Sequence, residues 1–124
     1  AHPPRGCPHC DEPQVVTAGP IWLGRTSDAA FVADTRNRAD DSMGRANRVR
    51  KLLRTIEAEL DTPTHYDQHR LCKRWNRSAP PMDEFLDALR EAGYDASVTH
   101  YGGTTFKTNA AIGAIRDATG DLTA

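Results

Sequence analysis

One segment of this sequence has a helical period that any fold of the chain must accommodate. Its apolar residues are Val49, Leu52, Leu53, Ile56 and Leu60. They stand at i, i+3, i+4, i+7 and i+11, the spacing of one face of an amphipathic helix, while Arg50, Lys51 and Arg54 fall roughly opposite. Residues 44–60 are therefore predicted to form a helix with one apolar and one basic side.

Two more helices are predicted downstream. Asp67 is a plausible N-cap for a short helix that runs through Trp75. Pro81 suits the first position of the next helix, and Gly93 suits the left-handed position after its end, where Tyr94 can pack back on Leu89. The apolar face of this third helix consists of Met82, Phe85, Leu86 and Leu89.

A β-hairpin is predicted after these helices. Residues 96–101 and 104–108 are rich in β-branched and aromatic side chains, and Gly102-Gly103 between them is typical of a two-residue turn. Asn109 is a candidate N-cap for a last helix, which Gly120 would end.

The predicted order of elements favours an α+β fold. Helix, short helix, helix and β-hairpin over residues 44–108 follow one another as in a winged helix, whose third helix and hairpin usually face nucleic acid. With 124 residues, the chain is expected to form one compact unit. We divide it into a partial zinc knuckle with a linking strand, residues 1–24, and a winged-helix-like domain with a C-terminal helix, residues 25–124.

The segment before the long helix has weaker signals. The apolar residues within Gln14–Leu23 surround Gly19-Pro20 and indicate a short strand or extended segment broken by a turn. Asp28 can cap a short helix carrying Phe31 and Val32, and the polar run Arg36–Ser42 is expected to be a loop.

The sequence Cys7-Pro-His-Cys10 has the spacing of half a zinc site. Two thiolates on one tight turn can reach a tetrahedral metal, but two further ligands are needed, with His2 and His9 as candidates within the chain. His9 lies between the cysteines, where its ring would point away from the metal. The alternative is a pair of free cysteines near a disordered end. Cys72 is expected to be a buried core thiol.

Basic residues cluster in the middle of a chain whose net charge is only −1. The cations of this cluster are Arg45, Arg48, Arg50, Lys51, Arg54, Arg70, Lys73, Arg74 and Arg77. They can neutralise RNA phosphates beside a hairpin that offers His100, Tyr101 and Lys107 as donor, stacking ring and cation. The alternative is a solvated helix face, which is the better interpretation of Arg50, Lys51 and Arg54 taken alone. The predicted RNA-binding residues are Arg70, Lys73, Arg74, Arg77, His100, Tyr101 and Lys107.

Several classes of function lack support in this sequence. It contains no glycine-rich cofactor loop after a strand, no nucleophile motif and no carboxylate pair placed for acid–base chemistry, so no catalytic residue is predicted. No stretch is apolar enough to span a membrane, and no signal pattern opens the chain. Cysteine usage favours a cytosolic protein.

Several segments resemble, in order, the C-terminal domain of the tRNA N2,N2-guanine dimethyltransferases. They are Cys7–Cys10, Ala18–Gly24, Tyr66–Cys72, Glu91–Ser97, Thr99-His100 and Lys107–Ala110. The resemblance covers nearly the whole chain. The Gly-Pro-Ile-Trp-Leu-Gly, Thr-His and Lys-Thr-Asn-Ala pieces are its more specific parts.

The resemblance implies a part in methylating the exocyclic amine of the guanine between the D stem and the anticodon stem of tRNA. S-adenosylmethionine, the donor, would be bound by an N-terminal catalytic domain that this chain lacks. The chain alone would then be inactive and would hold tRNA for that domain. The family often has two cysteine pairs at this junction, and only one lies within this chain.

Two other classes of protein compete with this interpretation. The first is a free-standing winged-helix regulator that binds DNA, but the predicted third helix is acidic, which suits a major groove poorly. The second is a docking domain that contacts the catalytic domain and never touches RNA, and the near-zero net charge gives it some support.

Overall fold

The computed structural model describes residues 2, 4–9 and 11–122 and has an α+β architecture. The helices are α1 (Ala29–Arg38), α2 (Ala46–Ala58), α3 (Gln68–Arg74), α4 (Met82–Glu91) and α5 (Ile112–Ala118). The strands are β1 (Tyr66–Asp67), β2 (Ala96–Val98) and β3 (Thr105–Thr108). No helix in the described part of the chain has both the length and the apolar character needed to cross a membrane.

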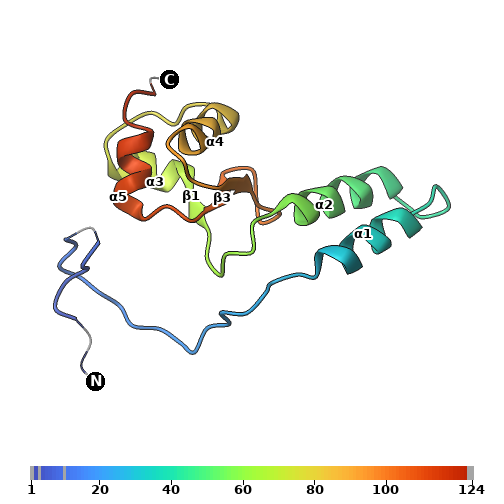
Figure 1. Cartoon of the computed structure of the whole chain (residues 1–124), viewed down its shortest axis with the longest axis horizontal. Coiled ribbons are helices and arrows are strands. Elements are labelled where there is room, and N and C mark those ends of the chain that lie inside the picture. The colour runs from blue at the N-terminus through green and yellow to red at the C-terminus, as the bar shows by residue number, and fades with distance from the viewer. Residues whose placement is uncertain (1, 3, 10, 123–124) are drawn as a thin grey trace.

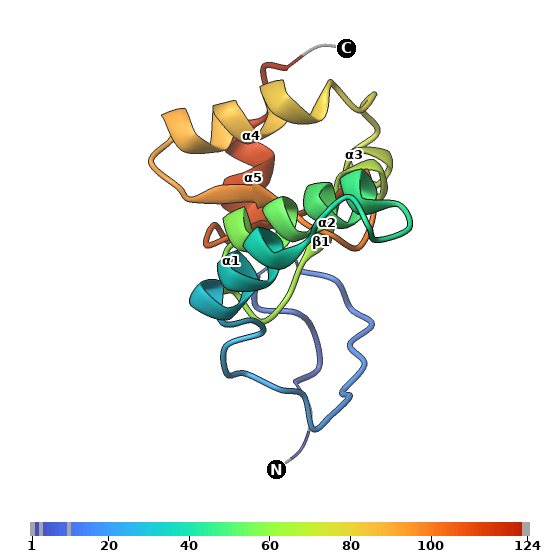
Figure 2. The same ribbon diagram turned by 90° about the vertical axis from the view of Figure 1, so that its right-hand side faces the viewer.

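The molecule has a globular part and a helical arm (Figure 1). Helices α3, α4 and α5 gather around the small sheet, whereas α1 and α2 pack against each other and project to one side. Figure 2 shows the same pair turned toward the viewer, with the N-terminal segment looping below it. This segment reaches α1 through a long stretch without regular secondary structure.

The core lies in the globular part. Its buried residues are Leu71, Cys72, Phe85, Leu86, Leu89, Ala96, Phe106, Ala110 and Ile115. Phe106 is the centre, because the ring of Phe85 meets it edge-on at a centroid distance of 5.1 Å and Tyr66 stacks on it at 5.7 Å. Burial of such side chains is the main stabilising contribution to a domain of this size.

The sheet is antiparallel, with strand order β1-β3-β2. Phe106 on the central strand pairs with both Tyr66 and Val98, and Lys107 pairs with Ser97. Successive side chains of a strand point to opposite faces. Phe106 therefore enters the core, while Lys107 lies on the other face of the sheet.

The predicted N-caps of α1 and α3 and the predicted ending of α4 are confirmed. Asp28 accepts from Phe31 N at 2.9 Å, and Asp67 accepts from Arg70 N at 2.9 Å. At the end of α4, Gly93 has φ +90° and Tyr94 N donates to Leu89 O at 3.0 Å, which is a Schellman ending. Local side-chain chemistry was enough to predict these boundaries.

Three local predictions were wrong. The hairpin loop is wider than Gly102-Gly103, since β2 ends at Val98 and β3 begins at Thr105. The Thr99 and Thr105 hydroxyls lie 2.6 Å apart and close this wider loop. Asn109 does not cap α5, because its side chain instead accepts from Asp95 N at 2.9 Å.

The third correction concerns the segment before α2. Helix α1 continues to Arg38, beyond the start of the expected loop at residue 36, whereas Gln14–Leu23 contains no strand, which leaves the predicted alternative of an extended segment. The helix over residues 44–60 is confirmed as α2, but it contributes no residue to the core cluster in the described part of the chain. It packs on α1, where Val32 is buried, and Arg36 Nε bonds Glu57 Oε2 at 2.8 Å. The sequence pattern gave the apolar face of this helix but not its partner.

We expect Gly93→Ala to destabilise the chain by roughly 1–2 kcal/mol, because a Cβ disfavours the left-handed conformation that ends α4. Urea unfolding followed by circular dichroism measures this change. Gly103→Ala is a matched control, since a Cβ there meets nothing within 4 Å and φ is not left-handed. Equal losses for the two variants would contradict the conformational explanation.

Candidate nucleic-acid interface

Helix α3 presents two cations to solvent. The Arg70 and Lys73 side chains are exposed and have no hydrogen bond or salt bridge with any described residue. The hydrogen bond from Arg70 N is the main reason that the pKa of Asp67 lies below its ordinary value, and the charge of Arg70 adds to it. These two predicted site residues are therefore available to a polyanion.

The other two basic residues of this group have structural partners. Arg77 donates to Thr119 O at 3.0 Å and Arg116 O at 3.2 Å, at the end of α5, and lies over the Trp75 ring at 4.9 Å. Arg74 bonds Glu12 Oε2 at 2.8 Å, which ties the N-terminal segment to α3. Both guanidinium groups thus hold separate parts of the chain together.

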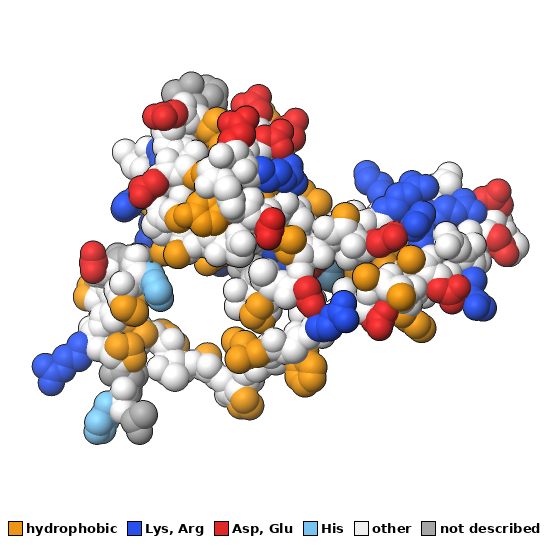
Figure 3. All heavy atoms as spheres, viewed as in Figure 1, with side chains coloured by type: hydrophobic (Ala, Val, Ile, Leu, Met, Phe, Trp, Pro, Cys, Tyr) orange, Lys and Arg blue, Asp and Glu red, His pale blue; other side chains and the backbone are white. Residues whose placement is uncertain are grey.

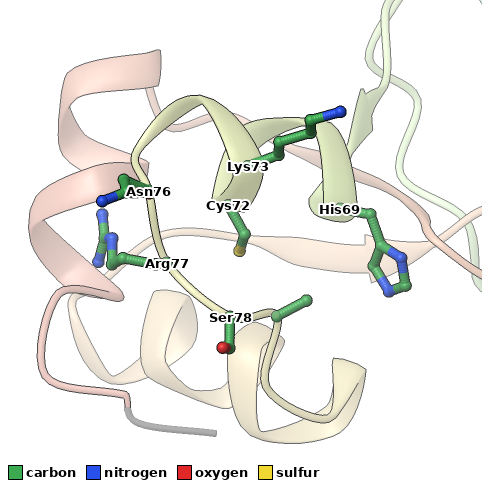
Figure 4. A pocket seen from close by; sticks show the side chains of 7 residues that line it. His69, Cys72, Lys73, Asn76, Arg77 and Ser78 are labelled. Carbon is green, nitrogen blue, oxygen red and sulfur yellow. The ribbon is translucent and has the colours of Figure 1, made fainter.

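A shallow hollow of about 670 Å³ lies beside α3. Its lining residues are His69, Cys72, Lys73, Asn76, Arg77, Ser78 and Ala79. In Figure 4 Cys72 points toward Ser78 across this hollow, while Arg77 turns toward α5. Burial raises the pKa of the Cys72 thiol, which agrees with its predicted place in the core.

Lys107 and His100 meet on a residue that sequence reasoning missed. Lys107 is 1% exposed, and its Nζ lies 2.8 Å from Glu59 Oε1. His100 Nδ1 donates to Glu59 Oε2 at 2.7 Å, and the His100 backbone N–H bonds the same oxygen at 3.1 Å. The Glu59 side chain is 5% exposed. Lys107 is therefore not accessible to a phosphate in this conformation. It would first have to break its contact with Glu59.

Glu59 is held in its charged form. Burial raises the pKa of Glu59, but the hydrogen bonds from Lys107 and His100 outweigh burial and bring the pKa below its ordinary value of 4.5. A buried ammonium needs such a counter-charge, because its desolvation is expensive. No acceptor other than this carboxylate reaches Lys107 Nζ among the described residues.

Three rings gather at the hairpin tip. Tyr101 is 52% exposed, and its ring lies 4.7 Å from that of His65 and 4.3 Å from that of His100. His65 was not among the predicted site residues. The structure therefore gives the tip an exposed aromatic surface held by Glu59.

Helix α2 carries a second group of exposed cations. They are Arg45, Arg48, Lys51 and Arg54, and in the part of the chain that the structure describes none of them has a salt bridge. Arg50 differs, because it bonds Ala39 O at 2.8 Å and Asp41 at 2.8 Å. Figure 3 shows Lys and Arg side chains gathered over this arm. Glu57 is the one carboxylate in α2, and this imbalance was the sequence signal for the group.

The knuckle turn is formed in part. Cys7 N donates to Glu12 O at 2.9 Å and Asp11 N donates to Cys7 O at 3.1 Å. Cys10 lies outside the described residues. The described residues contain no cluster of three or more His, Cys, Asp or Glu side chains able to hold a metal. They do not supply a tetrahedral zinc site by themselves.

Comparisons with known proteins agree over nearly the whole chain. The family model described as N2,N2-dimethylguanosine tRNA methyltransferase matches residues 2–119. A tRNA (guanine(26)-N(2))-dimethyltransferase of Haloarcula marismortui is 60% identical over 98% of this chain and 33% of its own length. The corresponding protein of Methanothermobacter thermautotrophicus is 36% identical over 95% of this chain and 31% of its own.

A solved structure gives the same result. Trm1 from Pyrococcus horikoshii, in complex with S-adenosyl-L-methionine, is 36% identical, with a TM-score of 0.74 over 81% of this chain and 27% of that one. These comparisons place the chain in a class of domains that occur in tRNA-methylating enzymes. The chain spans about a third of the length of these relatives. The chain belongs to the N2,N2-dimethylguanosine tRNA methyltransferase family.

We expect Glu59→Gln to destabilise the chain by about 3–5 kcal/mol at neutral pH, because it leaves the Lys107 ammonium buried without a counter-charge. Urea unfolding measures the loss. The double variant Glu59→Gln, Lys107→Met removes both charges and should recover much of it. A double variant as unstable as the single one would show that the charge is not the cause.

The same pair predicts a pH dependence. Since the pKa of Glu59 is lowered by folding, its contribution is complete above the ordinary value of 4.5 and is lost as pH falls through the folded pKa. The difference in melting temperature between the parent chain and Glu59→Gln should shrink in that acidic range. A difference that stays constant down to full protonation would contradict this assignment.

Proposed function

We propose that this chain is the tRNA-holding part of an S-adenosylmethionine-dependent tRNA guanine-N2 dimethyltransferase. The names of its relatives support the enzyme class. One observation carries the tRNA role: α3 and α2 present exposed cations that have no salt bridge with any described residue, and an exposed aromatic ring lies at the hairpin tip. Such cations bind phosphates by releasing counterions, and exposed rings stack on bases.

The predicted RNA-binding residues take different roles in this proposal. Arg70 and Lys73 contact phosphates, and Tyr101 offers its ring to an unstacked base. Arg74 and Arg77 position the N-terminal segment and the end of α5 around α3. His100 and Lys107 position the hairpin tip through Glu59.

S-adenosylmethionine is proposed to bind outside this chain. Donor-binding turns usually place glycine between a strand and the following helix. Here β1 runs directly into α3, and Asn109, Ala110 and Ala111 join β3 to α5, so neither junction contains glycine. When bound, the donor supplies the methyl group that the guanine amine receives. The residues of this chain would only hold and orient the tRNA.

The finer structural predictions are also part of the proposal. The strand order β1-β3-β2, with α2, α3 and α4 in sequence, supports a winged-helix-like fold for residues 25–124. The closed turn at Cys7 supports a knuckle within residues 1–24, with zinc requiring Cys10 and ligands beyond those described. A tRNA enzyme of this kind is expected in the cytoplasm, with its own catalytic domain as partner.

Helix α4 argues against the DNA-binding alternative. Its first turn carries Asp83 and Glu84, and Arg90, its one cation, is bonded to Asp87 Oδ1 at 2.7 Å and to Ala96 O at 2.9 Å. Phosphates would be repelled by this surface. The helix that a winged-helix regulator would place in the major groove is therefore unsuited to binding DNA in this chain.

We expect the double reversal Arg70→Glu, Lys73→Glu to weaken binding of this chain to folded tRNA by at least about tenfold at moderate salt, and to flatten the salt dependence. Fluorescence anisotropy with labelled tRNA across a salt titration measures both. Arg38→Glu is a control, because Arg38 is an exposed cation on α1 that is already paired with Asp34.

The stability of each variant is measured by urea unfolding so that a loss of folding is recognised. Unchanged affinity and slope for the folded double variant would exclude α3 from the tRNA surface. A preference for duplex DNA over tRNA in the parent chain would favour the regulator instead.

A further inference from the structure

A groove of about 460 Å³ runs between α2 and the tip of the β2–β3 hairpin. Its α2 side includes Arg48, Lys51 and Leu52, and its hairpin side includes Val98, His100 and Gly103. The volume falls in the range of about 300–1,000 Å³ that is usual for small-ligand sites. The groove is separate from the hollow beside α3, with which it shares no lining residue.

The walls of this groove are apolar and open to solvent. Leu52 on α2 is 46% exposed and Val98 on β2 is 42% exposed. Large exposed apolar side chains that share one concave surface commonly mark a binding site. A flat apolar or aromatic group can contact both the Leu52 and the Val98 side chain.

The rim of the groove is cationic. Arg48 and Lys51 are exposed and have no salt bridge with any residue that the structure describes. The carboxylate of Glu59 is withdrawn from the groove, because it is buried between Lys107 and His100. The excess of positive charge favours a ligand that is anionic at one end and flat and apolar at the other.

The two walls are held at a fixed separation. Leu60 N donates to the Ser97 hydroxyl at 2.9 Å, and Glu59 bonds the His100 backbone N–H at 3.1 Å. These bonds join the end of α2 to β2 and to the hairpin tip. The groove is therefore preorganised, which lowers the entropic cost of binding.

We propose that this groove binds one unpaired nucleotide of an RNA, with its base against Leu52 and Val98 and its phosphate between Arg48 and Lys51. Proteins that bind an unstacked base hold it against aromatic or apolar side chains, and nearby cations contact its phosphate. The inference rests on the proposed function and deepens it: α3 takes phosphates of the folded tRNA, while the groove takes a base that has left its stack.

The probe is hexauridylate, a short single-stranded RNA, titrated into the isotopically labelled chain. The methyl signals of Leu52 and Val98 and the amide signals of Gly102 and Gly103 should shift together and saturate. Lys51→Glu should weaken hexauridylate binding about tenfold and reduce the salt slope by about 0.7, the value of one single-strand phosphate contact.

Arg54→Glu is the matched control. It makes the same charge change on the same helix at an exposed residue that does not line the groove. It should weaken binding much less than Lys51→Glu. Equal effects of the two reversals, or signal shifts confined to α3, would overturn the groove assignment.

A second comparison separates this inference from the proposed function. If Arg70→Glu, Lys73→Glu weakens binding to folded tRNA while Lys51→Glu changes neither tRNA nor hexauridylate binding, the groove proposal fails and the tRNA role stands. If neither surface responds, both fail. An acidic peptide that binds the groove more tightly than hexauridylate would also overturn the assignment, in favour of a protein partner.

Discussion

The buried contact among Glu59, Lys107 and His100 is the interaction on which the rest of this structure depends. It joins the end of α2 to the hairpin tip, 41 residues further along the chain, and to the central strand that follows this tip. A charged pair with so little exposure is stable only while both charges are present, because removal of one leaves the other buried without a counter-charge. The contact therefore fixes the helical arm to the sheet, although α2 contributes nothing to the core cluster of the described residues.

The basic residues of the chain fall into two groups according to their partners. Arg36, Arg50, Arg77 and Lys107 are used inside the fold, where they bond carboxylates or helix-end carbonyls. Arg70, Lys73, Arg48 and Lys51 remain exposed without such partners among the described residues. A net charge of −1 is thus compatible with a polyanion-binding surface, because partner choice and not total charge decides which cations face solvent.

Much of the fold could be predicted because its signals are local. The caps at Asp28 and Asp67 and the Schellman ending at Gly93 depend on residues within one turn. The hairpin loop and the N-cap of α5 were predicted less well, because their polar side chains bond residues outside their own turn. The Thr99 hydroxyl bonds the Thr105 hydroxyl across the loop, and the Asn109 side chain accepts from Asp95 N. For the candidate site, the sequence supplied a set of expected residues, but it did not indicate which of these cations would be exposed or that Glu59 would contact both His100 and Lys107.

By itself, the sequence determined the α+β class, the existence of each helix, the apolar face of α2 and the family to which the chain belongs. Periodicity, capping residues and motif spacing carry that information, since each acts over a few residues. Only the tertiary structure decided that Lys107 is buried, that Arg77 holds α5, and that α2 meets the hairpin across an open cationic groove. These outcomes depend on contacts across dozens of residues, where burial selects a partner for each charge.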